Sequence, residues 1–590
     1  MLTQLAVKQI SFPSHAEDTL VLHHLPLGCL ENIALFCSLK IGMNKFWKYF
    51  LLFLIVVFTI QCAKKSRPTG GLKDTLPPTM INASPKLNTV FFDKEKITIT
   101  FNEFIKLKDL NKQLIISPPL EPDQYKIKPQ GTVSKKIQIQ LLDSLREGTT
   151  YTFNFGESIE DNNEGNPLPF FRYAMSTGPI IDSLEIRGKI TDAFDRITEP
   201  YTSIHLYPVD SAYNDSTIFL EKPFYATSTL DSVAYSFKNL RPDTYEIIAI
   251  KDVGGNYLFD QNVDKIGFLE KPITLPGDSI VNFRIFNEIP NLFWTRPFFI
   301  NINQIGFGYY GEPDLSAIKV KSKVPRNFRY LINRNREADT LNFWFRGDKI
   351  DSLKFGIEEK DTTRVFNVSF RKELRDSLKI SPLNKGFIGL RDSFKIESNL
   401  PLVKVNLDLI EIVGLDTIPV RFKASLDKNY DRLTLFYDWL PNDNYKIKLS
   451  PNALIDFWGT THDTLRYNIK TKPISDYGNI FLQVVRQDND PFILELVTPK
   501  GKALRRYDVS NELDLYEFKY LVPGNYLFRY TNDQNGNKKW DTGNYLKKIK
   551  PERVYYSPDT IELRANWDIN LQLKIPSSKF DSLGVSGVSN

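Results

Sequence analysis

Short segments in which apolar and polar residues alternate are the feature that most limits how this chain can fold. In Lys96–Asn102, Ile97, Ile99 and Phe101 fall on one side of an extended strand, and polar residues fall on the other. Similar segments, separated by turns rich in Pro, Gly and Asp, follow at 114–120, 136–142 and 150–156. This spacing predicts an all-β protein built from tandem β-sandwiches.

The length, charge and cysteine positions of the chain further limit the kind of protein it can be. A chain of 590 residues is too long for one core, so about four or five domains are expected. The 76 basic and 70 acidic residues are interspersed and leave a net charge of +6, which does not favour a nucleic-acid partner. Cys29, Cys37 and Cys62 are the only cysteines, so the chain after Cys62 is expected to hold no disulfide.

The segment Met43–Cys62 has the pattern of a secretory signal. Lys45 and Lys48 precede an apolar run at 50–60 that is shorter than the roughly 20 residues a membrane span needs. We interpret 43–62 as a lipoprotein signal peptide and Cys62 as the lipidated first residue, although Gln61 departs from the usual small residue. A lone transmembrane anchor is the alternative. Residues 1–42 are interpreted as an over-extended start, and 63–76 as a flexible tether.

Residues Ser84–Leu107, Tyr151–Leu168 and Tyr173–Pro179 together resemble the bacterial Ig-like domain of S-layer proteins (SbsA-like) and other surface proteins. The lead-in Cys62–Pro78 resembles that of Bacteroidetes lipoproteins carrying this domain. The resemblance implies an exported sandwich at the outer membrane, with no catalytic residue to transfer.

A second resemblance follows directly. Ile186–Pro208 and Tyr235–Asp252 are similar to the first hairpin and its continuation in carboxypeptidase-regulatory-like or Cna-B-like sandwiches, which have a prealbumin-like fold. Such domains are typically rigid spacers and less often adhesive modules.

Both patterns recur. Leu521–Asp541 parallels Leu240–Asp260, and Tyr445–Pro473 parallels Tyr151–Pro179, with Asp456 placed like Asp161. The predicted units are an Ig-like domain at 77–179, a Cna-B-like sandwich at 180–290, an unassigned β domain at 297–382, a second Ig-like domain at 383–473, a second Cna-B-like sandwich at 474–575 and a disordered tail at 576–590.

Catalytic patterns are missing from the sequence that follows the signal. His205 and His462 are its only histidines, and no P-loop, GxSxG or HExxH motif occurs. We therefore expect a protein that is not an enzyme, with a hydrolase as the weakest alternative.

The candidate metal site is an oxygen-rich loop. Asp533, Asn535, Asn537 and Asp541 alternate as calcium ligands do, but no bidentate glutamate closes the loop. A polar hairpin tip is the alternative. No other cofactor is expected.

Two tryptophans are candidates for glycan binding. Trp294 and Trp344 are positioned to form a sugar-stacking platform if they are exposed, and otherwise to pack between domains.

A repeated tripeptide, Asp-(Ser/Thr)-aliphatic, resembles the O-glycosylation signal of exported Bacteroidetes proteins. Average usage would produce about two or three copies. The candidate acceptors are Thr75, Ser144, Ser183, Ser232, Ser279, Thr340, Ser352, Ser377, Thr417, Thr464, Thr560 and Ser582. The alternative is turn chemistry, since Asp-Ser ends a turn where a strand begins.

Together these features predict a lipid-anchored outer-membrane protein whose sandwiches form a structural rod. Capture of a glycan or an envelope protein is the alternative function. The sequence leaves open whether the protein faces the periplasm or the cell surface.

Overall fold

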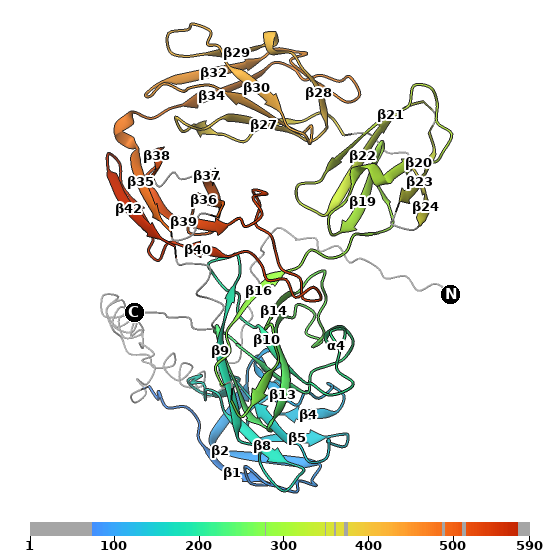
Figure 1. Ribbon diagram of the computed structural model, residues 1–590, viewed down its shortest axis with the longest axis vertical. Helices are drawn as coiled ribbons and strands as arrows, with labels where there is room; N and C mark the ends of the chain where they lie inside the picture. The colour runs from blue at the N-terminus through green and yellow to red at the C-terminus, as the bar shows by residue number, and fades with distance from the viewer. Residues whose placement is uncertain are drawn as a thin grey trace, which may run out of the picture. The chain divides into compact units, whose positions relative to one another are not determined.

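The computed structural model describes residues 73–575, except 278, 349, 359–361, 371–375, 487–489 and 510–514. Cys62, Ser582 and most of the proposed tether lie outside the described residues. Strands dominate the described chain (Figure 1). Its α-helices, α3 (Leu110–Gln113) and α4 (Thr217–Leu220), are one turn each, and no helix in these ranges is long and apolar enough to cross a membrane. The predicted all-β class of tandem sandwiches is confirmed.

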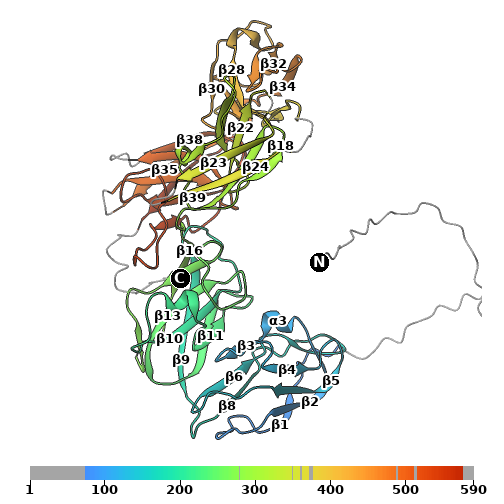
Figure 2. The same cartoon turned by 90° about the vertical axis from the view of Figure 1, so that its right-hand side faces the viewer.

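The first sandwich packs two sheets face to face (Figure 2). One sheet has the order β1-β2-β5-β4, with β7 paired to β2, and the other has the order β3-β6-β8. Ile97, Ile99 and Phe101 are fully buried between the sheets, as their alternation predicts. The strands are β1 (Met80–Ser84), β2 (Lys96–Leu107), β3 (Ile115–Ser117), β4 (Tyr125–Lys128), β5 (Ser134–Leu141), β6 (Thr150–Asn154), β7 (Ile159–Asp161) and β8 (Arg172–Ser176).

The second sandwich follows one continuous path of strands, β11-β10-β13-β14-β16-β9-β12, with β15 paired to β13. Strand β16 runs parallel to β9, and every other pair in this path is antiparallel. Ile186, Phe237 and Ile247 lie in its core. The strands are β9 (Leu184–Asp192), β10 (Ser203–Pro208), β11 (Tyr225–Ser228), β12 (Ala234–Leu240), β13 (Asp243–Lys251), β14 (Lys265–Phe268), β15 (Ile273–Leu275) and β16 (Phe283–Asn287).

The third sandwich is aromatic-rich. Phe307, Phe343 and Phe355 meet in its core with ring centroids 5.0–6.2 Å apart. Its sheets have the orders β17-β19-β22-β21, with β18 paired to β19, and β20-β23-β24. The strands are β17 (Phe293–Trp294), β18 (Phe298–Asn301), β19 (Gln304–Tyr310), β20 (Ile318–Val320), β21 (Arg329–Arg334), β22 (Thr340–Arg346), β23 (Ser352–Glu358) and β24 (Thr363–Ser369).

The fourth sandwich repeats the pairing of the first. Its first sheet has the order β25-β27-β31-β30, which corresponds to β1-β2-β5-β4 of the first sandwich. In its second sheet, the neighbouring strands β29, β32 and β34 correspond to β3, β6 and β8. The pair β28-β33 corresponds to the pairing of the end of β2 with β7. The strands are β25 (Ile380–Pro382), β26 (Gly386–Phe387), β27 (Phe394–Ser398), β28 (Leu402–Val405), β29 (Ile410–Val413), β30 (Lys423–Leu426), β31 (Arg432–Phe436), β32 (Asn444–Leu449), β33 (Leu454–Asp456) and β34 (Leu465–Lys470).

The fifth sandwich repeats the second. The parallel pair β35-β42 corresponds to β9-β16, and β39 pairs with β36, β40 and β41 as β13 pairs with β10, β14 and β15. The strands are β35 (Gly478–Val485), β36 (Phe492–Val497), β37 (Ala503–Val509), β38 (Leu515–Leu521), β39 (Gly524–Asn532), β40 (Val554–Tyr556), β41 (Ile561–Leu563) and β42 (Asp568–Lys574).

The loop between β39 and β40, residues 533–553, packs on the second sandwich. Tyr545 is fully buried in a cluster with Phe268 and Phe286. Its backbone N–H donates to the Glu288 carboxylate, and the Thr542 hydroxyl donates to the carbonyl of Asn287. These contacts join two sandwiches that are distant in sequence.

Candidate functional site

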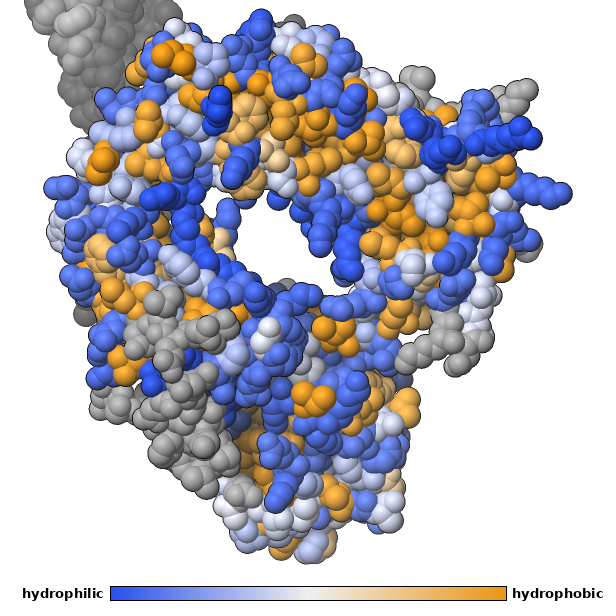
Figure 3. Space-filling view, turned by 45° about the horizontal axis from the view of Figure 1, so that its top comes forward, coloured by the Kyte–Doolittle hydropathy of each residue, from blue (hydrophilic) through white to orange (hydrophobic). Residues whose placement is uncertain are grey.

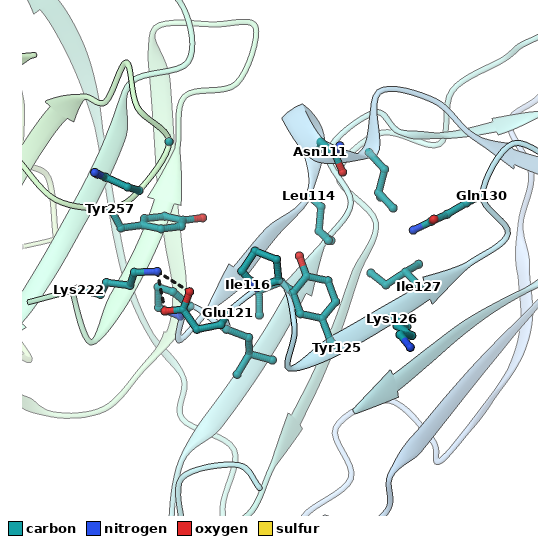
Figure 4. Close-up of a pocket in the computed structure, with 16 residues that line it drawn as sticks. Asn111, Leu114, Ile116, Glu121, Tyr125, Lys126, Ile127, Gln130, Lys222 and Tyr257 are labelled. Atoms are coloured by element: carbon teal, nitrogen blue, oxygen red, sulfur yellow. Dashed lines mark hydrogen bonds and ion pairs between the residues drawn. The ribbon is translucent and has the colours of Figure 1, made fainter. Parts of the chain in front are cut away.

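A cavity of about 660 Å³ lies where the first sandwich meets the second (Figure 4). Its volume falls within the roughly 300–1,000 Å³ typical of small-ligand sites. Apolar side chains form much of its wall, and amides and charged groups complete it. The lining residues are Leu110, Asn111, Leu114, Ile116, Pro119, Leu120, Glu121, Pro122, Tyr125, Lys126, Ile127, Gln130, Lys222, Gly255, Asn256 and Tyr257.

Tyr125 is the aromatic group that the first sandwich contributes. It begins β4, the last strand of its sheet, and is paired with Leu141 of β5 on one side only. The ring is half-buried, and burial raises the pKa of its hydroxyl. The side chain of Tyr125 packs against the core of the first sandwich and also lines the cavity.

Tyr257 is the aromatic group from the second sandwich, in the loop between β13 and β14. Its backbone is left-handed, with φ of 61°. The Asp252 carboxylate holds this turn by accepting hydrogen bonds from the N–H groups of Gly255 at 2.6 Å and Tyr257 at 2.7 Å. Burial and then the neighbouring Tyr125 and Asp252 raise the pKa of Tyr257. Both rings therefore border the same space (Figure 4).

An ion pair joins the two sandwiches at the cavity. Lys222 Nζ donates to both carboxylate oxygens of Glu121, at 2.6 and 2.7 Å. Both side chains are partly exposed, so solvent screens the pair and its contribution to stability is small. Its main consequence is electrostatic, because the two charges cancel inside the site.

Buried contacts next to the cavity hold the sandwiches together. Gln113 Nε2 donates to Asp231 at 2.6 Å, and the backbone N–H of Ala226 donates to Ser117 Oγ at 3.3 Å. Gln113 and Ser117 are both buried. The cavity is therefore part of a packed junction.

The four residues of the predicted calcium loop do come together. The side-chain amides of Asn535 and Asn537 both donate to Oδ2 of Asp541. Asp533 is buried, and its carboxylate accepts from the N–H groups of Asn537 at 3.0 Å and Lys538 at 2.9 Å. Within the described ranges, no group of three or more His, Cys, Asp or Glu side chains is arranged to hold a metal. The corresponding loop in the second sandwich places Asp252 as the turn-holding residue beside Tyr257.

The two predicted platform tryptophans lie in the interior. Trp294 is fully buried in the third sandwich, 6.0 Å from the ring of Tyr309. Trp344 is 5% exposed, packs against Leu400 and Phe457 of the fourth sandwich, and donates from Nε1 to Asn333 at 2.8 Å. A buried ring cannot stack on a sugar from solvent. The expected platform is therefore wrong for these residues. Trp344 packs between two sandwiches, as the alternative has it, whereas Trp294 packs within the core of its own sandwich.

The two histidines of the described chain are both buried. His205 is completely buried in β10, and burial lowers its pKa to about 3. Its Nε2 lies 2.8 Å from the hydroxyl of Ser203, so the two side chains are hydrogen-bonded within the sandwich. His462 accepts a hydrogen bond at Nε2 from the N–H of Leu454 at 3.2 Å.

Most tripeptide acceptors lie at the surface. Of the eleven within the described residues, nine are exposed, whereas Thr340 and Thr464 are half-buried. Ser183, Thr340, Ser352, Thr464 and Thr560 stand at or directly before the first residue of a strand. This placement fits both glycosylation and the turn alternative.

Sequence reasoning missed Tyr125 and Tyr257 as a pair, because 131 intervening residues separate them and each occurs in a β pattern that also explains it. One signal was available for Tyr257, an aromatic residue that directly follows the turn sequence Asp-Val-Gly-Gly-Asn.

On the face drawn in Figure 3, apolar residues lie in groups that polar and charged residues interrupt.

Comparisons with known proteins agree with the fold. The family model of the bacterial Ig-like domain matches residues 74–175. No curated protein sequence matches the chain.

Solved structures were also compared with the whole chain. The Bacillus anthracis TIE protein is 10% identical, with 89% of this chain and 78% of that chain covered and a TM-score of 0.14. The major pilin subunit BcpA of Bacillus cereus is 10% identical, with 66% and 98% covered and a TM-score of 0.12. Surface layer protein SbsC is 9% identical, with 83% and 68% covered and a TM-score of 0.14. Scores this low carry no functional argument. What the comparisons and the fold together show is a protein of tandem β-sandwiches whose first sandwich matches the bacterial Ig-like domain.

Proposed function

We propose that this protein is a non-enzymatic scaffold of a Bacteroidetes cell envelope, held at the outer membrane by a lipid on Cys62. The observation that carries the scaffold role is the docking of the 533–553 loop on the second sandwich. That contact buries Tyr545 and Glu288 and joins modules that are distant in sequence. Such bracing resists bending between modules, which suits a protein that holds others in position.

The non-enzymatic part of the proposal is supported by the bacterial Ig-like match and by the burial of His205 and His462. The lipid anchor is supported by the signal pattern at 43–62 and by the Lys-, Pro- and Gly-rich stretch after it. The basic start Ala63-Lys64-Lys65 favours the periplasmic face, because export tags on surface lipoproteins of this bacterial group are typically acidic.

The anchor is tested by intact-mass analysis of membrane-extracted protein from the native host. We expect an acylated N-terminal Cys62, and loss of the protein from the membrane fraction in C62A, with S66A as the matched control. A peptide from residues 2–40 in the mature protein, or membrane retention of C62A, would contradict the proposal.

The scaffold role and its location need two further experiments. Pull-down with the mature protein from solubilised envelopes should recover envelope proteins reproducibly, and protease treatment of intact cells should leave the protein uncut. Hydrolysis of polysaccharide or peptide substrates by the purified protein would contradict the non-enzymatic role.

A further inference from the structure

We propose that the cavity between the first and second sandwiches binds a neutral oligosaccharide. This adds a ligand site to the scaffold function and does not depend on that function. The site is the one that Tyr125, Tyr257 and the Glu121–Lys222 pair border.

The two tyrosines provide the faces that a sugar ring packs against. Each is half-buried, with its body in the cavity wall. Sugars bury their C–H faces on aromatic rings and offer hydroxyls to the polar tips of tyrosines. Two rings from different modules allow consecutive sugar units to be held along the cavity.

Free amides supply the matching polar groups. Asn111 and Gln130 are exposed at the cavity, and within the described chain their side chains make no hydrogen bond. Each amide offers donors and an acceptor together, which is the pairing that a sugar hydroxyl requires. Asn256 also lines the cavity beside Tyr257. Its Oδ1 already accepts from the N–H of Leu258 at 2.9 Å, and its side-chain NH2 makes no hydrogen bond within the described chain.

The charge of the site favours a neutral ligand. Glu121 and Lys222 neutralise each other, so Lys126 is the remaining unpaired charge among the lining residues. One exposed lysine does not make a site for phosphate or for a sulfated chain, which requires several converging cations.

The turn that carries Tyr257 is held in place. A left-handed backbone is unfavourable for a bulky residue and persists only where surrounding contacts impose it. Here the Asp252 carboxylate imposes it through the hydrogen bonds from the N–H groups of Gly255 and Tyr257. A turn that is already fixed loses little backbone entropy when a ligand binds.

Isothermal titration of the recombinant mature protein with maltotriose, cellotriose, mannotriose and N-acetylchitotriose tests the proposal. At least one trisaccharide should bind at millimolar concentration or below, and inorganic phosphate should not. Y125A and Y257A should each weaken binding by about tenfold, the effect of losing one aromatic contact. Y310A, which removes an exposed tyrosine from the third sandwich, should bind as the wild type does.

Q130A serves as the variant that leaves the core untouched, in case a tyrosine variant fails to fold by circular dichroism. It should also weaken binding. The proposal is overturned if none of the four trisaccharides binds, or if the folded variants bind as tightly as the wild type.

Discussion

Tyr545 in the fifth sandwich donates its backbone N–H to the carboxylate of Glu288 in the second, across 257 residues of sequence. The other Glu288 oxygen accepts from Gln261 Nε2 at 2.6 Å. Both Tyr545 and Glu288 are buried. A buried carboxylate with two donors stabilises this contact, whereas the loss of either partner leaves a desolvated polar group.

Truncation of Tyr545 should open this interface. Y545A removes a fully buried ring, and a large aromatic-to-alanine change in a core costs about 3–5 kcal/mol. We expect faster amide hydrogen exchange in 533–553 and in β14 and β16, and a lower midpoint of urea unfolding. L546A, which truncates the exposed neighbour, should change the free energy of unfolding by about 0.5 kcal/mol or less. Equal effects of the two variants would show that the loop does not dock in solution.

Lys550 should make this interface pH-dependent. Burial lowers its pKa from 10.5 to about 8, and its ammonium lies 3.9 Å from the ring centroid of Phe268. Between about pH 8 and 10.5 the unfolded chain therefore binds this proton and the folded chain does not, so the Lys550 contribution to stability rises with pH. The advantage of K550M over the wild type in chemical unfolding should be largest below pH 8 and shrink towards pH 10.5. Lys550 as a whole is exposed, so the effect comes from the desolvation of its ammonium against Phe268, and a constant difference would contradict the lowered pKa.

Asp161 should stabilise the first sandwich through its turn. The carboxylate accepts from the N–H groups of Glu164 at 2.6 Å, Asn166 at 2.7 Å and Gly165 at 3.1 Å. Burial alone would raise its pKa, but these hydrogen bonds outweigh burial and lower the pKa to about 2.

The Asp161 contribution is therefore present above pH 3.8 and is lost as the pH falls towards 2. D161A should destabilise the protein by about 1–3 kcal/mol at neutral pH, because three donors lose their partner. D123A, at an exposed loop position, is the control and should be close to wild type. Near-identical unfolding of D161A and D123A would contradict this role.

If the Asp-(Ser/Thr)-aliphatic tripeptides are O-glycosylation signals, exposed acceptors should be modified more than half-buried ones. We expect the native protein to be heavier than recombinant protein, with sugar on exposed acceptors such as Ser144 and Ser352 and less on half-buried Thr340 and Thr464. Peptide mass spectrometry of protein from both hosts measures this. Identical masses, after allowance for lipid, would leave turn chemistry as the explanation.

Calcium binding remains a prediction for the 533–541 loop. Binding requires Asn535 and Asn537 to turn their amide oxygens towards the ion in place of the N–H groups now directed at Asp541. Millimolar calcium should then raise the Tm, and D541N should remove the rise while keeping the Asp533 turn. An unchanged Tm, with or without a chelator, would identify the loop as purely structural.

The sequence alone determined the strands, the turns and the repeat. Alternation placed Ile97, Ile99 and Phe101 inside, and the Asp161 and Asp456 turns recur because the carboxylate bonds locally to N–H groups two to five residues ahead. These are short-range effects, so local composition records them.

The tertiary structure decided which residues meet between modules. It packed Trp344 against Phe457 of the fourth sandwich, docked Tyr545 on the second sandwich and brought Tyr257 to the same cavity as Tyr125. The alternation of a strand shows which of its faces is apolar. It does not show whether that face packs on the opposite sheet of the same sandwich, packs on another sandwich or faces solvent. That choice depends on how whole sandwiches pack, through contacts between residues more than a hundred positions apart.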